Sequence, residues 1–131
     1  MSWEPELDEL RRREALAAEM GGEESVARQR GRGKLTVRER IEMLVDAGSW
    51  RETGMIAGRG VYGDDGSLTE FTPTNFVVGQ GRVDGRAVIV QGDDFTVRGG
   101  AADAAIWEKM VWAERAANEF RVPLVRLVDG T

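Results

Sequence analysis

Two apolar runs on either side of an Asp-Gly dipeptide constrain the fold of this chain most strongly. The segments NFVVGQGRV and RAVIVQ flank Asp84-Gly85, a dipeptide favoured in two-residue hairpin turns because both central residues adopt positive φ angles. The run 87–90 is continuously apolar, which is typical of a strand covered on both faces. The sequence therefore predicts a β-hairpin whose second strand lies inside a layered fold.

A helix and a further strand follow this hairpin. Apolar residues recur with helical spacing over 101–119, and the run PLVRLV then returns to an apolar strand pattern. A strand, a helix and a strand of these lengths indicate a βαβ unit with a parallel strand pair. The predicted fold class is therefore α/β. The helical spacing is seen at Ile106, Met110, Ala113, Ala117 and Phe120, and the first four of these are expected to face the sheet.

The N-terminal third indicates two helices. A narrow apolar stripe predicts a helix over 5–19, and Gly21-Gly22 should end it. Thr36 followed by Glu39 forms a capping-box pattern, which predicts a second helix from Val37 to Ala47. The expected buried face of this second helix consists of Ile41, Leu44 and Val45.

Two glycine-containing motifs resemble nucleotide-binding loops without meeting their requirements. In the segment 50–75, where strand patterns are weak and 63–66 reads as a turn, GRGVYG has the spacing of a dinucleotide loop. The polar stretch DDGSLTEF follows it, whereas such a loop must open a helix. GRGKLT ends like a phosphate loop, but Leu35 stands where Ser or Thr should hold a metal. Neither motif predicts a nucleotide site.

Composition excludes several classes of function. The 131 residues suffice for one modest domain and include no cysteine and no histidine, which removes thiol chemistry and the usual neutral base and metal ligand. A net charge of -5 argues against nucleic acid as the main partner. No apolar run approaches the ~20 residues of a membrane span, and the charged N-terminus lacks a signal-peptide pattern. We expect a cytoplasmic protein with no metal site.

A run of basic residues lies between the two predicted helices. Such runs are usually solvated surface, and a solvated connector is the favoured interpretation. The alternative is that some residues of the run contact a phosphate-bearing ligand. Arg32 and Lys34 are the possible contacts, and charge reversal at both positions would test this. The run consists of Arg28, Arg30, Arg32, Lys34, Arg38 and Arg40.

The stretch DDFTVRGG, residues 93–100, lies where the first strand of the βαβ unit should end. Ligands of α/β folds gather at the carboxyl ends of strands. Gly99 and Gly100 precede the predicted helix, whose first N–H groups would point outward at its positive end. The stretch is either a ligand site built mostly from backbone groups or a plain turn from strand to helix.

Four blocks of the sequence together resemble a known family. They are RRREALAAEMGG, GKLTVRERIEMLVDAGSW, GQGRVDGRAVIVQGDDFTVRGGA and EKMVWAERAANEFRVPLVRLVDGT. They resemble the N-terminal part of the carboxyltransferase (beta) subunit of biotin-dependent acyl-CoA carboxylases, which include propionyl-CoA and methylcrotonyl-CoA carboxylases. The resemblance covers Leu7 to Thr131 and is weakest between Met55 and Asn75. Arg30 stands where the family commonly has His, which puts any role of that His in doubt.

This resemblance implies a crotonase-like (ClpP/crotonase) fold, with a helical arm over 1–48 and part of a carboxyltransferase domain over 49–131. It implies transfer of a carboxyl group from carboxybiotin to the α-carbon of an acyl-CoA. In the family, carboxybiotin releases CO2, the biotin enolate takes the α-proton, and backbone N–H pairs stabilise both enolates. Those pairs lie beyond the position matching Thr131, so no catalytic residue is assigned here.

The resemblance also implies a binding role and partners for this chain. Arg98 would lie near the CoA phosphates or the mouth of the ligand site. Expected partners are a biotin carboxylase or biotin carrier subunit and further carboxyltransferase subunits in a homo-oligomer. The acyl-CoA channel would be lined by Phe95, Thr96, Val97, Arg98, Gly99 and Gly100.

Surplus apolar surface suggests that a partner covers part of this chain. Trp107 and Val111 form a second apolar stripe on the predicted helix, and Arg126 interrupts an otherwise apolar strand. Three interpretations remain open: part of a longer carboxyltransferase, a catalytically inactive CoA-binding module, or a structural piece that binds a partner without binding CoA.

Overall fold

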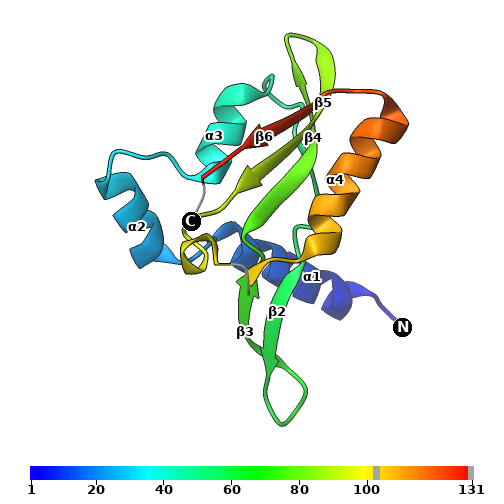
Figure 1. Cartoon of the computed structure of the whole chain (residues 1–131). Helices are drawn as coiled ribbons and strands as arrows, with labels where there is room; N and C mark the ends of the chain where they lie inside the picture. The colour runs from blue at the N-terminus through cyan, green and yellow to red at the C-terminus, as the bar shows by residue number, and fades with distance from the viewer. Residues whose placement is uncertain (102–103, 130–131) are drawn as a thin grey trace.

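A four-stranded sheet between helices forms the centre of the molecule (Figure 1). The computed structural model describes residues 1–101 and 104–129. The sheet has the order β1-β4-β5-β6, and β2 and β3 form a separate two-stranded hairpin that extends away from it. The elements are α1 (Glu4–Ala18), α2 (Glu23–Gly31), α3 (Val37–Leu44), β1 (Arg51–Thr53), β2 (Gly58–Tyr62), β3 (Leu68–Pro73), β4 (Phe76–Val83), β5 (Arg86–Asp93), the 3-10 turn η1 (Arg98–Gly100), α4 (Trp107–Phe120) and β6 (Leu124–Leu127).

The predicted hairpin is present, and its turn has the expected backbone. Strands β4 and β5 pair antiparallel up to Val83 and Arg86, and the two turn residues Asp84 and Gly85 have φ angles of 50° and 79°. The Asp46 carboxylate accepts hydrogen bonds from both turn N–H groups, at 2.9 and 2.8 Å. The turn is therefore held both by its own residue types and by the chain that follows α3.

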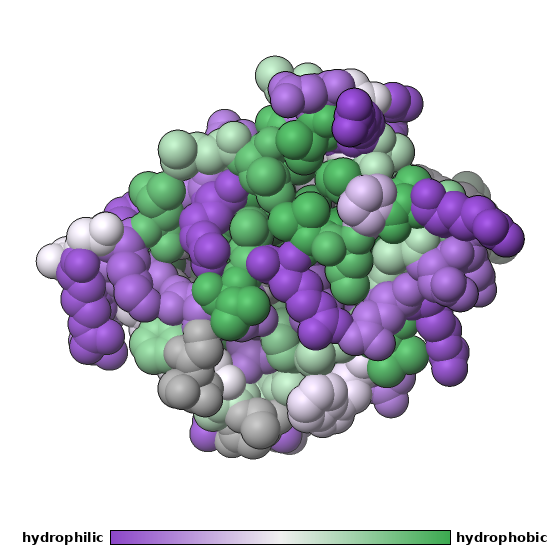
Figure 2. All heavy atoms as spheres, turned by 45° about the horizontal axis from the view of Figure 1, so that its top comes forward, coloured by the Kyte–Doolittle hydropathy of each residue, from purple (hydrophilic) through white to green (hydrophobic). Residues whose placement is uncertain are grey.

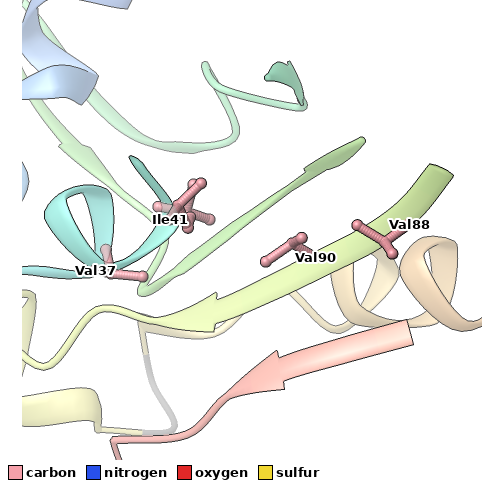
Figure 3. Close-up of a cluster of buried hydrophobic side chains, with 5 residues drawn as sticks. Val37, Ile41, Val88 and Val90 are labelled. Carbon is pink, nitrogen blue, oxygen red and sulfur yellow. The ribbon is translucent and has the colours of Figure 1, made fainter. Parts of the chain in front are cut away.

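The predicted βαβ unit is confirmed as β5, α4 and β6, with β6 parallel to β5. The alternation of side chains along β5 divides the core between two faces of the sheet. Val88 and Val90 pack against Val37 and Ile41 of α3 (Figure 3). Ile89 packs on the opposite face against α4, whose alanines at 113, 116 and 117 allow a close approach. Both faces of β5 are covered, as its continuous apolar run indicates.

Helix α4 differs from the prediction at its start and in one buried position. It begins at Trp107 rather than near residue 101. Phe120, which shares the predicted helical spacing, is 54% exposed because the helix ends there and Arg121 turns the chain back in a left-handed conformation. Lys109 is buried instead, with only 8% of its surface exposed. Charge patterning did not indicate this position.

The N-terminal helices are partly as expected. Helix α1 matches the predicted range closely, and Ala17 is its one buried residue. The capping box of Thr36 and Glu39 is present, although α3 ends at Leu44 instead of Ala47. Helix α2 was not predicted, because few of its residues are apolar and no periodic stripe marks it. Its ends carry compensating charges, acidic at the start and basic at the end.

The glycine-rich middle of the chain contains strands that the sequence showed only weakly. GRGVY forms strand β2, so the dinucleotide-loop interpretation fails in the structure as it does in the sequence. The predicted turn at 63–66 joins β2 to β3, and Gly63 N donates to Ser67 O at 2.8 Å. In the described part of the chain, no helix has the length and apolar character needed to cross a membrane.

Apolar side chains remain on the surface. Figure 2 shows them gathered in the middle of one face, with polar side chains around them. Trp107 and Val111 are exposed as predicted, at 60% and 39%. The interpretation of Arg126 needs correction. This residue lies on the edge strand β6, and its side chain pairs with Glu114 of α4. It therefore gives no support for a missing partner, and that inference now rests on the apolar surface alone.

Candidate functional site

The predicted ligand stretch follows β5 at the carboxyl edge of the sheet, and its residues divide into two groups. Thr96 and Val97 are buried, at 6% and 1% exposure. Phe95, Arg98 and Gly99 line a cavity of about 460 Å³. Only the second group is placed to meet a ligand with its side chains or exposed backbone.

The buried group is fixed by Asp94. Its carboxylate accepts hydrogen bonds from Thr96 N at 3.0 Å and from Thr96 Oγ1 at 2.6 Å. Burial raises the pKa of Asp94, and the hydrogen bonds from Thr96 oppose this shift. The pair closes a tight turn directly after the strand, so its role is to shape the loop.

The Gly-Gly segment does not open a helix, which corrects the sequence-based interpretation. Arg98, Gly99 and Gly100 have φ angles of 50°, 59° and 75°, and Gly100 N donates to Val97 O at 3.0 Å. Helix α4 begins several residues later, at Trp107. A left-handed conformation at a non-glycine residue such as Arg98 is uncommon and concentrates at functional loops.

Helix α2 supplies the opposite wall of this cavity. Ser25, Arg28 and Gln29 come from α2, and Arg32 follows it directly. In Figure 1 α2 lies beside the loop that follows β5. We call this cavity the arginine cleft, because Arg28, Arg32 and Arg98 line it and, among the residues that the structure describes, no carboxylate residue does. Such a cleft suits an anionic ligand with several oxygens, since arginine forms bidentate bonds to phosphate.

The arm carrying α2 is docked on the loop by a close backbone contact. Gly21 N donates to Thr96 Oγ1 at 3.0 Å. A Cβ atom at position 21 would lie 1.8 Å from Thr96 O. The glycine that the sequence indicated as a helix stop is therefore also required for the approach of α1 and α2 to the β5 loop.

Most of the basic run is paired within the chain, and four of its six residues lie in α2 and α3 rather than in a connector. Arg28, Arg30 and Arg38 pair with Glu24, Glu39 and Glu52, respectively. Within residues 1–101 and 104–129, the Arg32 side chain makes no hydrogen bond or ion pair.

The two residues proposed for phosphate contact therefore lie in different surroundings. Arg32 lines the arginine cleft. Lys34 instead pairs with Asp129, with Nζ 2.7 Å from Oδ1, and lies 5.4 Å from the centre of the Phe95 ring.

Sequence reasoning placed Arg28 in the basic run but missed α2, the helix that carries it. The signal that could have found it is the spacing of Glu24 and Arg28, an i,i+4 pair of the order that supports a helix.

A second cavity, of about 520 Å³ beside α3, is larger and contains Trp50. Its one arginine, Arg38, is bound through two nitrogens to Glu52, at 2.5 and 3.1 Å. The arginine cleft is therefore the better candidate for an anion.

Comparison with protein families identifies a family to which most of the chain is similar. Residues 28–131 match the carboxyl transferase domain family. The chain is 35% identical over 130 residues to the propionyl-CoA carboxylase carboxyltransferase subunit of Haloferax mediterranei, covering 99% of this chain and 25% of that protein. It is 37% identical over 124 residues to the human mitochondrial propionyl-CoA carboxylase beta chain, covering 93% of this chain and 23% of that protein. The chain thus spans about a quarter of the length of these curated relatives.

Solved structures agree with this match. A transcarboxylase 12S structure, described as a hexamer with methylmalonyl-coenzyme A and methylmalonic acid bound, superposes with a TM-score of 0.80 at 29% identity. It covers 99% of this chain, which corresponds to 26% of that one. A single-chain, multi-domain long-chain acyl-CoA carboxylase gives a TM-score of 0.75 at 26% identity, over 95% of this chain and 14% of that one.

Proposed function

Because the chain belongs to the carboxyl transferase domain family, we propose that it acts as part of a carboxyltransferase that moves a carboxyl group from carboxybiotin to the α-carbon of an acyl-CoA. The carboxybiotin would be carried by a partner protein, and further carboxyltransferase subunits would complete the assembly. The residues of this chain would bind and orient the acyl-CoA. In the two-part division proposed from the sequence, 1–48 is an arm and 49–131 is part of the carboxyltransferase domain.

One observation carries the binding part of this proposal. The arginine cleft brings Arg28 and Arg32, from the N-terminal arm, against Phe95, Arg98 and Gly99, from the loop after β5. These residues are far apart in the sequence. Coenzyme A carries a pyrophosphate and a 3′-phosphate, and arginine side chains suit both. We propose that the phosphate-bearing end of acyl-CoA occupies this cleft, beside Phe95, Arg98 and Gly99 of the predicted channel.

The test is the kinetics of the native carboxyltransferase carrying Arg32→Glu. We expect the KM for acyl-CoA to rise about tenfold, the equivalent of about 1.4 kcal/mol of lost binding, with kcat nearly unchanged. The reason is that a guanidinium is replaced by a charge that repels phosphate, at a position remote from the reacting carbon. The effect should shrink at high ionic strength, because salt screens exposed charges.

Arg12→Glu is the matched control. Arg12 is an exposed residue of α1 that does not line the cleft, so the same charge change there should leave the KM unchanged. An unaltered KM in Arg32→Glu would count against the placement of acyl-CoA. Binding of CoA without any carboxyl transfer by the native protein would favour the inactive CoA-binding module instead.

A further inference from the structure

The Lys34 side chain is bound within the protein and is not free to contact a phosphate. Its Nζ lies 2.7 Å from Asp129 Oδ1 and 5.4 Å from the centre of the Phe95 ring. The Asp129 side chain is only 13% exposed. Lys34 therefore joins the connector between α2 and α3 to the end of β6 and to a wall of the arginine cleft at the same time.

The other oxygen of Asp129 holds α2. Gln29 Nε2 donates to Asp129 Oδ2 at 3.0 Å and to Leu35 O at 3.2 Å. Gln29 is 5% exposed and itself lines the cleft. One carboxylate thus accepts hydrogen bonds from two residues about 100 positions away in the chain.

Asp129 is in turn fixed to the sheet. Its N–H donates to Asp93 Oδ2 at 3.0 Å, at the end of β5. The preceding carbonyl, Val128 O, accepts from Arg40 Nη1 at 3.3 Å. The carboxyl ends of the two parallel strands and the N-terminal arm therefore meet at this residue, and its position follows from the sheet.

These contacts connect the two walls of the arginine cleft. Arg28 precedes Gln29 on α2, and Arg32 is the residue directly after that helix, so both arginines are attached to the same element as Gln29. Phe95, on the facing wall, is held by the ring contact with Lys34. A further tie between the walls, from Gly21 to Thr96, lies at the other end of α2.

We propose that Asp129 is a positioning residue: through Gln29 and Lys34 it holds α2 and the Phe95 loop at the separation at which Arg28, Arg32 and Arg98 bind one phosphate-bearing ligand. Asp129 itself does not line the cleft. The inference rests on the proposed function, because the ligand in question is the phosphate-bearing end of acyl-CoA.

The experiment measures CoA binding to the native full-length protein by isothermal titration calorimetry. Asp129→Asn and Lys34→Met are expected to raise the Kd for CoA about five- to tenfold, while kcat at saturating acyl-CoA stays near the original value. Exposed ion pairs contribute little to folding stability, and Lys34 is 51% exposed. Lys34→Met is therefore the variant that tests the inference if Asp129→Asn folds poorly.

A double-mutant cycle separates positioning from direct binding. If Asp129 acts by placing Arg32, then Arg32→Ala weakens CoA binding less in the Asp129→Asn background than in the original protein. Full additivity of the two effects would overturn the inference. Arg30→Met is the matched control, because Arg30, in the last turn of α2, pairs with Glu39 of α3 without contacting Asp129 or lining the cleft. The Kd of the Arg30→Met variant for CoA should equal that of the original protein.

The failure of this inference can be told apart from the failure of the proposed function. If Arg32→Ala leaves the Kd for CoA unchanged, the arginine cleft is not the phosphate site. If Arg32→Ala weakens binding and neither Asp129→Asn nor Lys34→Met does, the cleft stands and the positioning role of Asp129 is wrong.

Discussion

At the residue scale, the fold buries the amine of Lys109, where carrying a positive charge lowers the stability of the protein. Burial lowers the pKa of Lys109 to about 8, with Glu52 opposing the shift. Its stem passes Gly54, where a Cβ atom would lie 3.6 Å from Lys109 Cε. In the described part of the chain its amine has no hydrogen bond or ion pair, so Lys109→Met should stabilise the protein at pH 7, by about 3 kcal/mol at most.

The pH dependence gives the check. Between pH 8 and the ordinary lysine pKa of 10.5, Lys109 is mostly protonated in the unfolded chain and mostly neutral in the folded protein. The free energy of unfolding therefore rises with pH over this interval. Urea denaturation at several pH values should show the rise in the original protein and not in Lys109→Met. A Lys34→Met control should retain it, and an unchanged pH profile in Lys109→Met would contradict the prediction.

At the scale of elements, the docking of the N-terminal arm depends on Gly21. In Gly21→Ala the new methyl group would overlap Thr96 O, so the arm must shift, at a cost of about 1–3 kcal/mol in unfolding free energy. Gly31→Ala is the matched control, because no atom lies within 4 Å of its added Cβ and the position is helical. That change should be neutral or slightly stabilising. Equal midpoints in urea denaturation for the two variants would show that the Gly21 contact is unimportant.

At the scale of the whole molecule, the exposed apolar surface and the length of the relatives lead to one expectation. The chain covers 25% of the Haloferax relative, and Trp107 is 60% exposed. Antibody capture and intact-mass measurement should therefore find a cellular polypeptide much heavier than 14.4 kDa. A species of 14.4 kDa that melts cooperatively and binds CoA would instead support an independent module.

The sequence by itself determined the local structure wherever the residue types permit only one arrangement. Asp84-Gly85 required a tight hairpin turn, the capping box at Thr36 set the start of α3, and the apolar run of β5 required cover on both faces. These features depend on neighbours in the chain or on simple periodicity. The family also followed from contiguous blocks of sequence.

Only the tertiary structure decided how the candidate site is assembled. It brought α2 to the β5 loop, separated Arg32 from Lys34, and directed Thr96 and Val97 inward. It also buried Lys109 and paired Arg126 with Glu114. Each of these outcomes depends on contacts between residues distant in the sequence, such as Gly21 with Thr96 and Gln29 with Asp129. Local propensity and spacing carry no information about such contacts, because folding chooses them through packing and charge pairing.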